Sequence, residues 1–106
     1  MADPIVIRPQ GRLDGSTSGE FEQDLLKRIA AGDELLVLDF SKIDFVSSAG
    51  LRAILAAAKR IKSAGGRLAI CSPKKQVKEI FDVTGCMTLL DIFPTFEAAV
   101  AHLAMK

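Results

Sequence analysis

The sequence predicts a small α/β domain in which a mostly parallel sheet of four or five strands is packed with about four helices. The apolar run at residues 35–40 is long enough to form a strand that is buried on both faces. Several other stretches carry apolar residues at helical spacing and follow such runs in the chain. Strands that alternate with helices require crossover connections, which produce parallel pairing. With 106 residues, we expect a single domain over residues 1–106.

The first half of the chain should contain two strands and a helix. We expect one strand over residues 5–13, which Pro9 bends or places at a sheet edge. The segment at residues 17–20 is typical of a capping box, so a helix should begin there and end before Gly32. The apolar run at residues 35–40 is then the central strand.

The second half continues the alternation. A helix is predicted over residues 48–64 and a strand over residues 68–71. Ser72 followed by Pro73 indicates an N-cap and a first helical position, so the next helix should begin there. A short strand over residues 89–93 and a terminal helix after Thr95 complete the expected fold.

The composition excludes several classes of protein. Hydrophobic residues make up 49% of the chain and the net charge is +1, so neither disorder nor a basic nucleic-acid footprint is expected. Apolar runs are too short to span a membrane, and the two cysteines do not form a Cys-x-x-Cys pair, so no metal site is predicted. We expect a cytoplasmic, reduced protein without a cofactor.

Catalytic motifs are not evident in the sequence. The single histidine, His102, is far along the chain from the serine pair described below, and no phosphate-cradling Gly-x-x-x-x-Gly-Lys segment occurs. We therefore expect a binding module rather than an enzyme.

Ser47 and Ser48 open the apolar-periodic helix at residues 48–64. A hydroxyl at a helix start lies beside unpaired backbone N–H groups and the positive end of the helix dipole, which favours a phosphate. The same hydroxyl is a preferred N-cap, and either serine could take that place. The helix period does not separate the two serines, and on physical grounds alone capping is the more common role for such a hydroxyl.

The segments at residues 11–14, 38–41 and 45–51 resemble a STAS domain and, more narrowly, a bacterial anti-sigma factor antagonist. That family carries an Asp-Ser-Ser/Thr-Gly-Leu pattern in which the hydroxyl residue after the aspartate is phosphorylated. Aligned on Gly50 and Leu51, Ser48 takes the phosphorylated position, with Ser47 as the second choice. Ser47 stands where the family has aspartate, and Ala49 stands where it has a second hydroxyl residue.

The resemblance implies partners as well as a site. The chain would dock on an anti-sigma factor that is also a serine kinase and thereby regulate transcription. Phosphorylation of Ser48 would weaken docking, a protein phosphatase would restore it, and ATP would belong to the kinase. The alternative is a non-switching module in a transporter or a larger signalling complex. The residues expected to contact the partner are Asp14, Thr17, Asp39, Ser47, Ser48, Ala49, Gly50 and Arg52.

Three further points concern the first strand, the role of Asp39 and the oligomeric state. STAS domains usually carry a strand before the Gly-x-Leu-Asp segment, but only residues 1–4 are available for it, so it should be missing or very short. Asp39 ends the central strand, where it either approaches Ser48 or bonds the backbone of the following turn. The sequence leaves the oligomeric state open.

Overall fold

The computed structural model of the chain describes residues 3–85 and 89–104. Its elements, in chain order, are β1 (Ile5–Ile7), β2 (Gly11–Leu13), α1 (Ser18–Ala30), β3 (Leu35–Asp39), β4 (Ile43–Val46), α2 (Ser48–Ser63), β5 (Arg67–Cys71), α3 (Lys75–Thr84), β6 (Asp91–Phe93) and α4 (Phe96–Ala104). The predicted α/β class is confirmed, and the helices lie close to the predicted ranges.

The strands form two sheets rather than one. A four-stranded sheet has the order β1-β3-β5-β6, and every pair in it is parallel. A separate two-stranded sheet pairs β2 with β4, also in parallel. The prediction of a largely parallel sheet with four strands is confirmed, whereas the second sheet was not anticipated.

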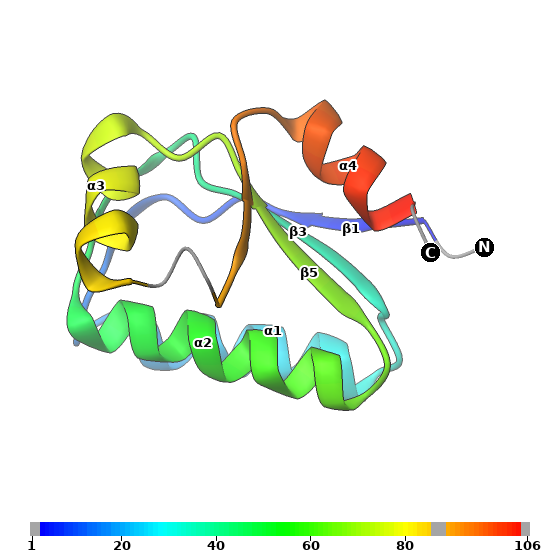
Figure 1. Cartoon of the computed structure of the whole chain (residues 1–106). Helices are drawn as coiled ribbons and strands as arrows, with labels where there is room; N and C mark the ends of the chain where they lie inside the picture. Colours follow the sequence, from blue (N-terminus) through cyan, green and yellow to red (C-terminus); the bar gives the residue numbers. More distant parts are fainter. Residues whose placement is uncertain (1–2, 86–88, 105–106) are drawn as a thin grey trace.

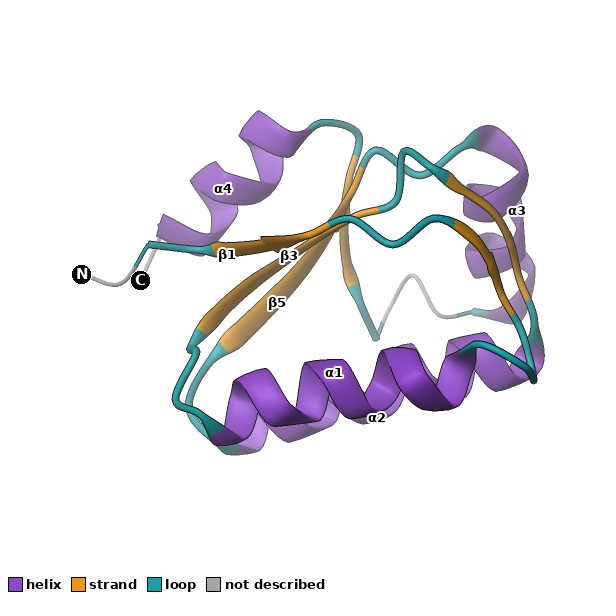
Figure 2. Ribbon diagram, turned by 180° about the vertical axis from the view of Figure 1, so that it is seen from behind, coloured by secondary structure: helices purple, strands orange, loops and turns teal. Residues whose placement is uncertain are grey.

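Helices cover both faces of the four-stranded sheet. Helices α1 and α2 lie side by side on one face and α4 lies on the other (Figure 1 and Figure 2). β3 contributes to both layers: Leu36 and Leu38 join the core cluster that includes α1 and α2, whereas Val37 packs with the α4 side chains. Each of these three side chains is fully buried, which stabilises the fold by about 1.5–3 kcal/mol per residue. The prediction that residues 35–40 are buried on both faces is confirmed.

Helix α3 lies beyond one end of the sheet and packs against β4 (Figure 1). The Phe40 and Phe81 rings, both fully buried, lie with their centroids 6.3 Å apart. This contact joins the turn after β3 to α3 and closes the core at that end.

The prediction of one strand over residues 5–13 is wrong. The segment forms β1 in the larger sheet and β2 in the smaller one, with a break at residues 8–10. Pro9 has no N–H to give to a ladder, and Gly11 has a φ of +81°, so the chain turns here and changes sheets. The strand expected to be missing or confined to residues 1–4 is therefore present as β1, at one edge of the sheet; residues 1–2 lie outside the described residues.

The prediction that α3 begins at Ser72 is also wrong. The N–H of Ser72 donates to the Phe93 carbonyl oxygen at 3.0 Å, which continues the pairing of β5 with β6. Ser72 has a φ of 56°, so it cannot open a right-handed helix. The helix begins two residues later than predicted, at Lys75, with Lys74 at the N-cap position and no side-chain cap.

Two smaller differences from the prediction concern the cap of α1 and the strand β4. Thr17 occupies the N-cap position of α1, as predicted, but its hydroxyl makes no capping hydrogen bond. The second difference is β4, which the sequence analysis missed because its four residues directly precede the serine pair and do not alternate between buried and exposed positions.

Candidate functional site

The start of α2 packs tightly against the end of β2. The N–H of Ser47 donates to the Leu13 carbonyl oxygen at 2.8 Å, which fixes the entry of the chain into the helix. A Cβ atom added to Gly50 would lie 2.4 Å from that same oxygen. Gly50 is therefore needed for close approach of the helix to the strand, a contact inside this chain rather than with another protein.

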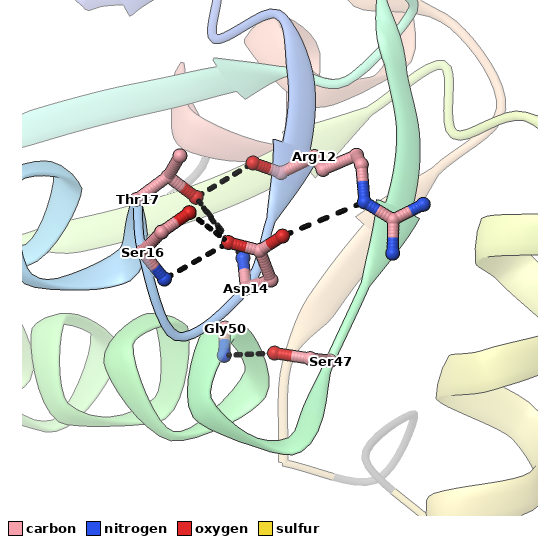
Figure 3. Close-up of polar contacts among 6 residues, drawn as sticks. All are labelled: Arg12, Asp14, Ser16, Thr17, Ser47 and Gly50. Atoms are coloured by element: carbon pink, nitrogen blue, oxygen red, sulfur yellow. Dashed lines mark hydrogen bonds and ion pairs between the residues drawn. The ribbon is translucent and has the colours of Figure 1, made fainter.

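The two serines at this junction have different surroundings. Ser47 is the N-cap, with extended backbone, and its Oγ accepts a hydrogen bond from the Gly50 N–H at 3.2 Å (Figure 3). Ser48 is the first helical residue and is exposed. Its hydroxyl has no hydrogen-bond partner within residues 3–85 and 89–104. One serine thus stabilises the helix, and the other presents its hydroxyl to solvent.

The loop that follows β2 is held in a compact turn beside this junction. Both the N–H and the Oγ of Ser16 donate to Asp14 Oδ1, at 3.0 and 2.7 Å. Thr17 Oγ1 donates to the Arg12 carbonyl oxygen at 2.6 Å and accepts from the Asp14 N–H at 3.0 Å (Figure 3). Asp14 and Thr17 therefore set the loop's shape, and Leu13, the residue before Asp14, carries the oxygen that meets α2.

The Asp14 carboxylate is held in its ionised form. Hydrogen bonds from the Ser16 hydroxyl and N–H, together with the Arg12 guanidinium, lower its pKa below the ordinary value. The loop next to the start of α2 therefore carries a fixed negative charge at neutral pH.

Arg12 is a site residue that the sequence reasoning missed. Its guanidinium lies 4.4 Å from the centre of the Phe45 ring, and its Nε is 3.4 Å from Asp14 Oδ2. Arg12 and Phe45 are opposite each other in the β2–β4 register, so strand alternation places both on the same face. The contact between Arg12 and Phe45 could have been predicted only if β4 had been recognised as a strand.

Asp39 bonds to Arg8 and Ser41 rather than to the serine pair. Its Oδ2 is 3.0 Å from Arg8 Nε, and its Oδ1 accepts from the Ser41 N–H at 3.0 Å. Burial opposes ionisation, but the hydrogen bonds from Ser41 and the Arg8 guanidinium outweigh it and lower the pKa of Asp39. β4 runs between Asp39 and the start of α2, and the bond to the Ser41 N–H is the turn contact that the sequence predicted as one of two possibilities.

The remaining predicted residues lie on the first turns of α2. Ala49 is half-buried, whereas Arg52 is exposed and has no ion pair within the described parts of the chain. The structure therefore places seven of the eight predicted contact residues at or beside the β2–α2 junction, whereas the eighth, Asp39, ends β3 and bonds to Arg8 and Ser41. Whether these residues contact a partner stays a prediction.

Other kinds of site find little support in the described residues. They contain no group of three or more His, Cys, Asp or Glu side chains placed to hold a metal ion. His102 lies on α4, where its Nε2 is 2.9 Å from Arg67 Nη2, on the sheet face opposite α2. None of the helices within residues 3–85 and 89–104 is both long and apolar enough to cross a bilayer.

The parallel sheet covered by helices on both faces defines a small α/β domain, and comparison with known proteins identifies its family. The STAS domain model matches residues 2–99, and the chain belongs to the STAS domain family. This confirms the resemblance seen in the sequence.

Two relatives and one solved structure are similar over most of their lengths. BtrV of Bordetella bronchiseptica, named as an anti-sigma factor antagonist, is 33% identical over 92 residues, which are 87% of this chain and 79% of the relative. An anti-sigma F factor antagonist of Paenibacillus polymyxa is 28% identical over 100 residues, covering 93% and 86%. A crystal structure from Thermotoga maritima, with the same kind of name, has a TM-score of 0.92, 22% identity and coverage of 99% and 91%.

Proposed function

We propose that this protein is an anti-sigma factor antagonist whose docking on its partner is controlled by phosphorylation of Ser48. The observation that carries the proposal is the difference between the two serines. The Ser47 hydroxyl is engaged as the α2 cap, whereas the Ser48 hydroxyl is exposed at the helix start. A kinase can reach Ser48 without opening the fold, and the backbone N–H groups and the helix dipole tolerate the added phosphate.

The relatives supply the class of partner. Proteins named as anti-sigma factor antagonists match this chain over most of their own lengths. We therefore propose a cytoplasmic anti-sigma factor with serine kinase activity as the partner, with a protein phosphatase that removes the phosphate. In this scheme the protein is a binding module, and ATP is bound by the kinase.

The switch acts through charge at a docking surface. A phosphate adds about −1.5 to −2 charge at neutral pH, where the partner must pack closely against the start of α2. The Asp14 carboxylate on the adjacent loop is already ionised and lies beside the Arg12 guanidinium, so the phosphate itself is the new charge that a partner meets at Ser48. Docking is then lost by repulsion and desolvation rather than by refolding.

Site mapping with the cognate kinase tests the proposal. Incubation with the kinase and ATP, followed by intact-mass measurement and peptide mapping, should place one phosphate on Ser48. The variant Ser48→Ala should remain unmodified, and the matched variant Ser47→Ala should still be phosphorylated. Modification confined to Ser47 would contradict the assignment, and no modification by any candidate kinase would favour the non-switching module.

A binding measurement tests the consequence of phosphorylation. By calorimetric titration against the anti-sigma factor, Ser48→Ala should bind like the unmodified protein, whereas stoichiometrically phosphorylated protein should bind at least about tenfold more weakly. Equal affinity of the phosphorylated and unmodified forms would rule out the switch.

A further inference from the structure

We propose that Arg52 pairs with the phosphate on Ser48 and is thereby withdrawn from the partner-binding surface. This inference deepens the proposed function and rests on it. Ser48 is the first residue of α2 and Arg52 follows four residues later on the same helix, with both residues exposed. Side chains four residues apart are neighbours on a helix surface, and an acidic group that precedes a basic one by four residues is the favourable order.

The geometry of a helix favours contact in this direction. Side chains on an α-helix are tilted toward its N-terminus, so a long side chain at position 52 extends over the turn that contains Ser48. The planar guanidinium can donate two parallel hydrogen bonds to phosphate oxygens, which a lysine ammonium cannot reproduce. Arg52 is thus placed to meet a phosphate that is attached to Ser48.

The charges around the helix start leave Arg52 available for this role. α2 carries four basic side chains, Arg52, Lys59, Arg60 and Lys62, and no acidic one. In the unphosphorylated protein, Arg52 therefore has no carboxylate on its own helix to pair with. At the neighbouring end of β2, Arg12 and Asp14 already contact each other, and Arg12 also lies over the Phe45 ring.

The consequence is a switch with two effects. Phosphorylation adds negative charge at Ser48 and also engages the Arg52 cation one turn away, which is exposed in the unmodified protein. In a variant without Arg52, phosphorylation should change partner affinity by a smaller factor, because only the first effect remains.

The experiment measures the second pKa of the phosphate, which is near 6 for an unperturbed phosphoserine. Phosphoserine is installed at position 48 of the full chain by genetic encoding, so no kinase is required, and the phosphate is titrated by phosphorus NMR. Replacing Arg52→Gln should raise this pKa by about 0.2–0.4 unit relative to the otherwise unchanged chain, since a cation four residues away stabilises the dianion. Arg52→Lys should restore part of the difference.

Two matched variants remove the same charge elsewhere. Lys59→Gln lies eleven residues from Ser48 on the same helix and should leave the phosphate pKa unchanged. Arg60→Gln, in the last turn of α2, should also leave it unchanged. Equal pKa values for the Arg52→Gln chain and the parent would overturn the inference, as would an equal rise with Lys59→Gln or Arg60→Gln.

The outcome is separable from that of the proposed function. If the kinase fails to modify Ser48, the proposed switch is wrong whatever the phosphate pKa shows. If Ser48 is modified and controls docking but Arg52→Gln has no effect on the pKa, only the pairing with Arg52 is wrong.

Discussion

The serine-led helix starts at Ser47–Ser48 and at Ser72–Pro73 look alike in the sequence, yet only the first begins a helix. At the first, the N–H of Ser47 donates to Leu13, and its Oγ is free to cap the next turn. At the second, the N–H of Ser72 donates to Phe93, and the residue is held at a φ of 56°. The strand that receives the serine N–H therefore decides what the serine does, and local preference for a cap is the weaker effect.

The largest expected effect comes from disrupting the contact between Gly50 and the Leu13 backbone at the start of α2. In Gly50→Ala, the new Cβ would meet the Leu13 backbone at 2.4 Å, so the helix must move away from β2. The free energy of unfolding should fall by about 2 kcal/mol. Chemical denaturation measures it, with Gly19→Ala in α1 as the matched control, because a Cβ there meets nothing within 4 Å. The control should keep or gain stability; equal losses in both variants would contradict the close-approach argument.

A smaller effect should separate the two adjacent serines. Ser47→Ala removes the hydrogen bond to the Gly50 N–H, and the free energy of unfolding should fall by about 1 kcal/mol. Ser48→Ala should change it by less than about 0.5 kcal/mol, since that hydroxyl is exposed. Thermal or urea unfolding of the unphosphorylated variants measures both. A larger loss for Ser48→Ala than for Ser47→Ala would reverse the assignment of cap and switch.

The smallest expected effect tests whether the backbone at Ser72, the second serine-led segment, is strained. Ser72→Gly should raise the free energy of unfolding by about 0.5 kcal/mol, because relief of left-handed backbone strain slightly exceeds the added entropy of the unfolded chain. Ser63→Gly, at the end of α2 with ordinary helical backbone, should lower it instead. Urea unfolding midpoints report the difference, and a loss at both positions would show that Ser72 is not strained.

The candidate site was predictable in part. Ser48, Gly50 and Arg52 follow from the family pattern and the helix period, and the structure places all three on the first turns of α2. Arg12 was missed because its relation to Phe45 depends on β4, a strand too short to recognise from four residues. Asp39 was grouped with the serines because it ends the central strand, where α/β sheets gather their functional loops, but its side chain bonds to Arg8 and to the turn at Ser41 instead.

The amino-acid order by itself determined the α/β class, the four helices, the central strand and the family, because these depend on apolar periodicity and on contiguous motifs. Tertiary structure decided where the first strand divides to form a second sheet, where α3 begins and which serine caps α2. Each of these depends on a hydrogen-bond partner far along the chain: Lys42 for Gly11, Phe93 for Ser72 and Leu13 for Ser47. A backbone N–H must find an acceptor when it is buried, and which acceptor is available is a property of the packed fold rather than of the local sequence.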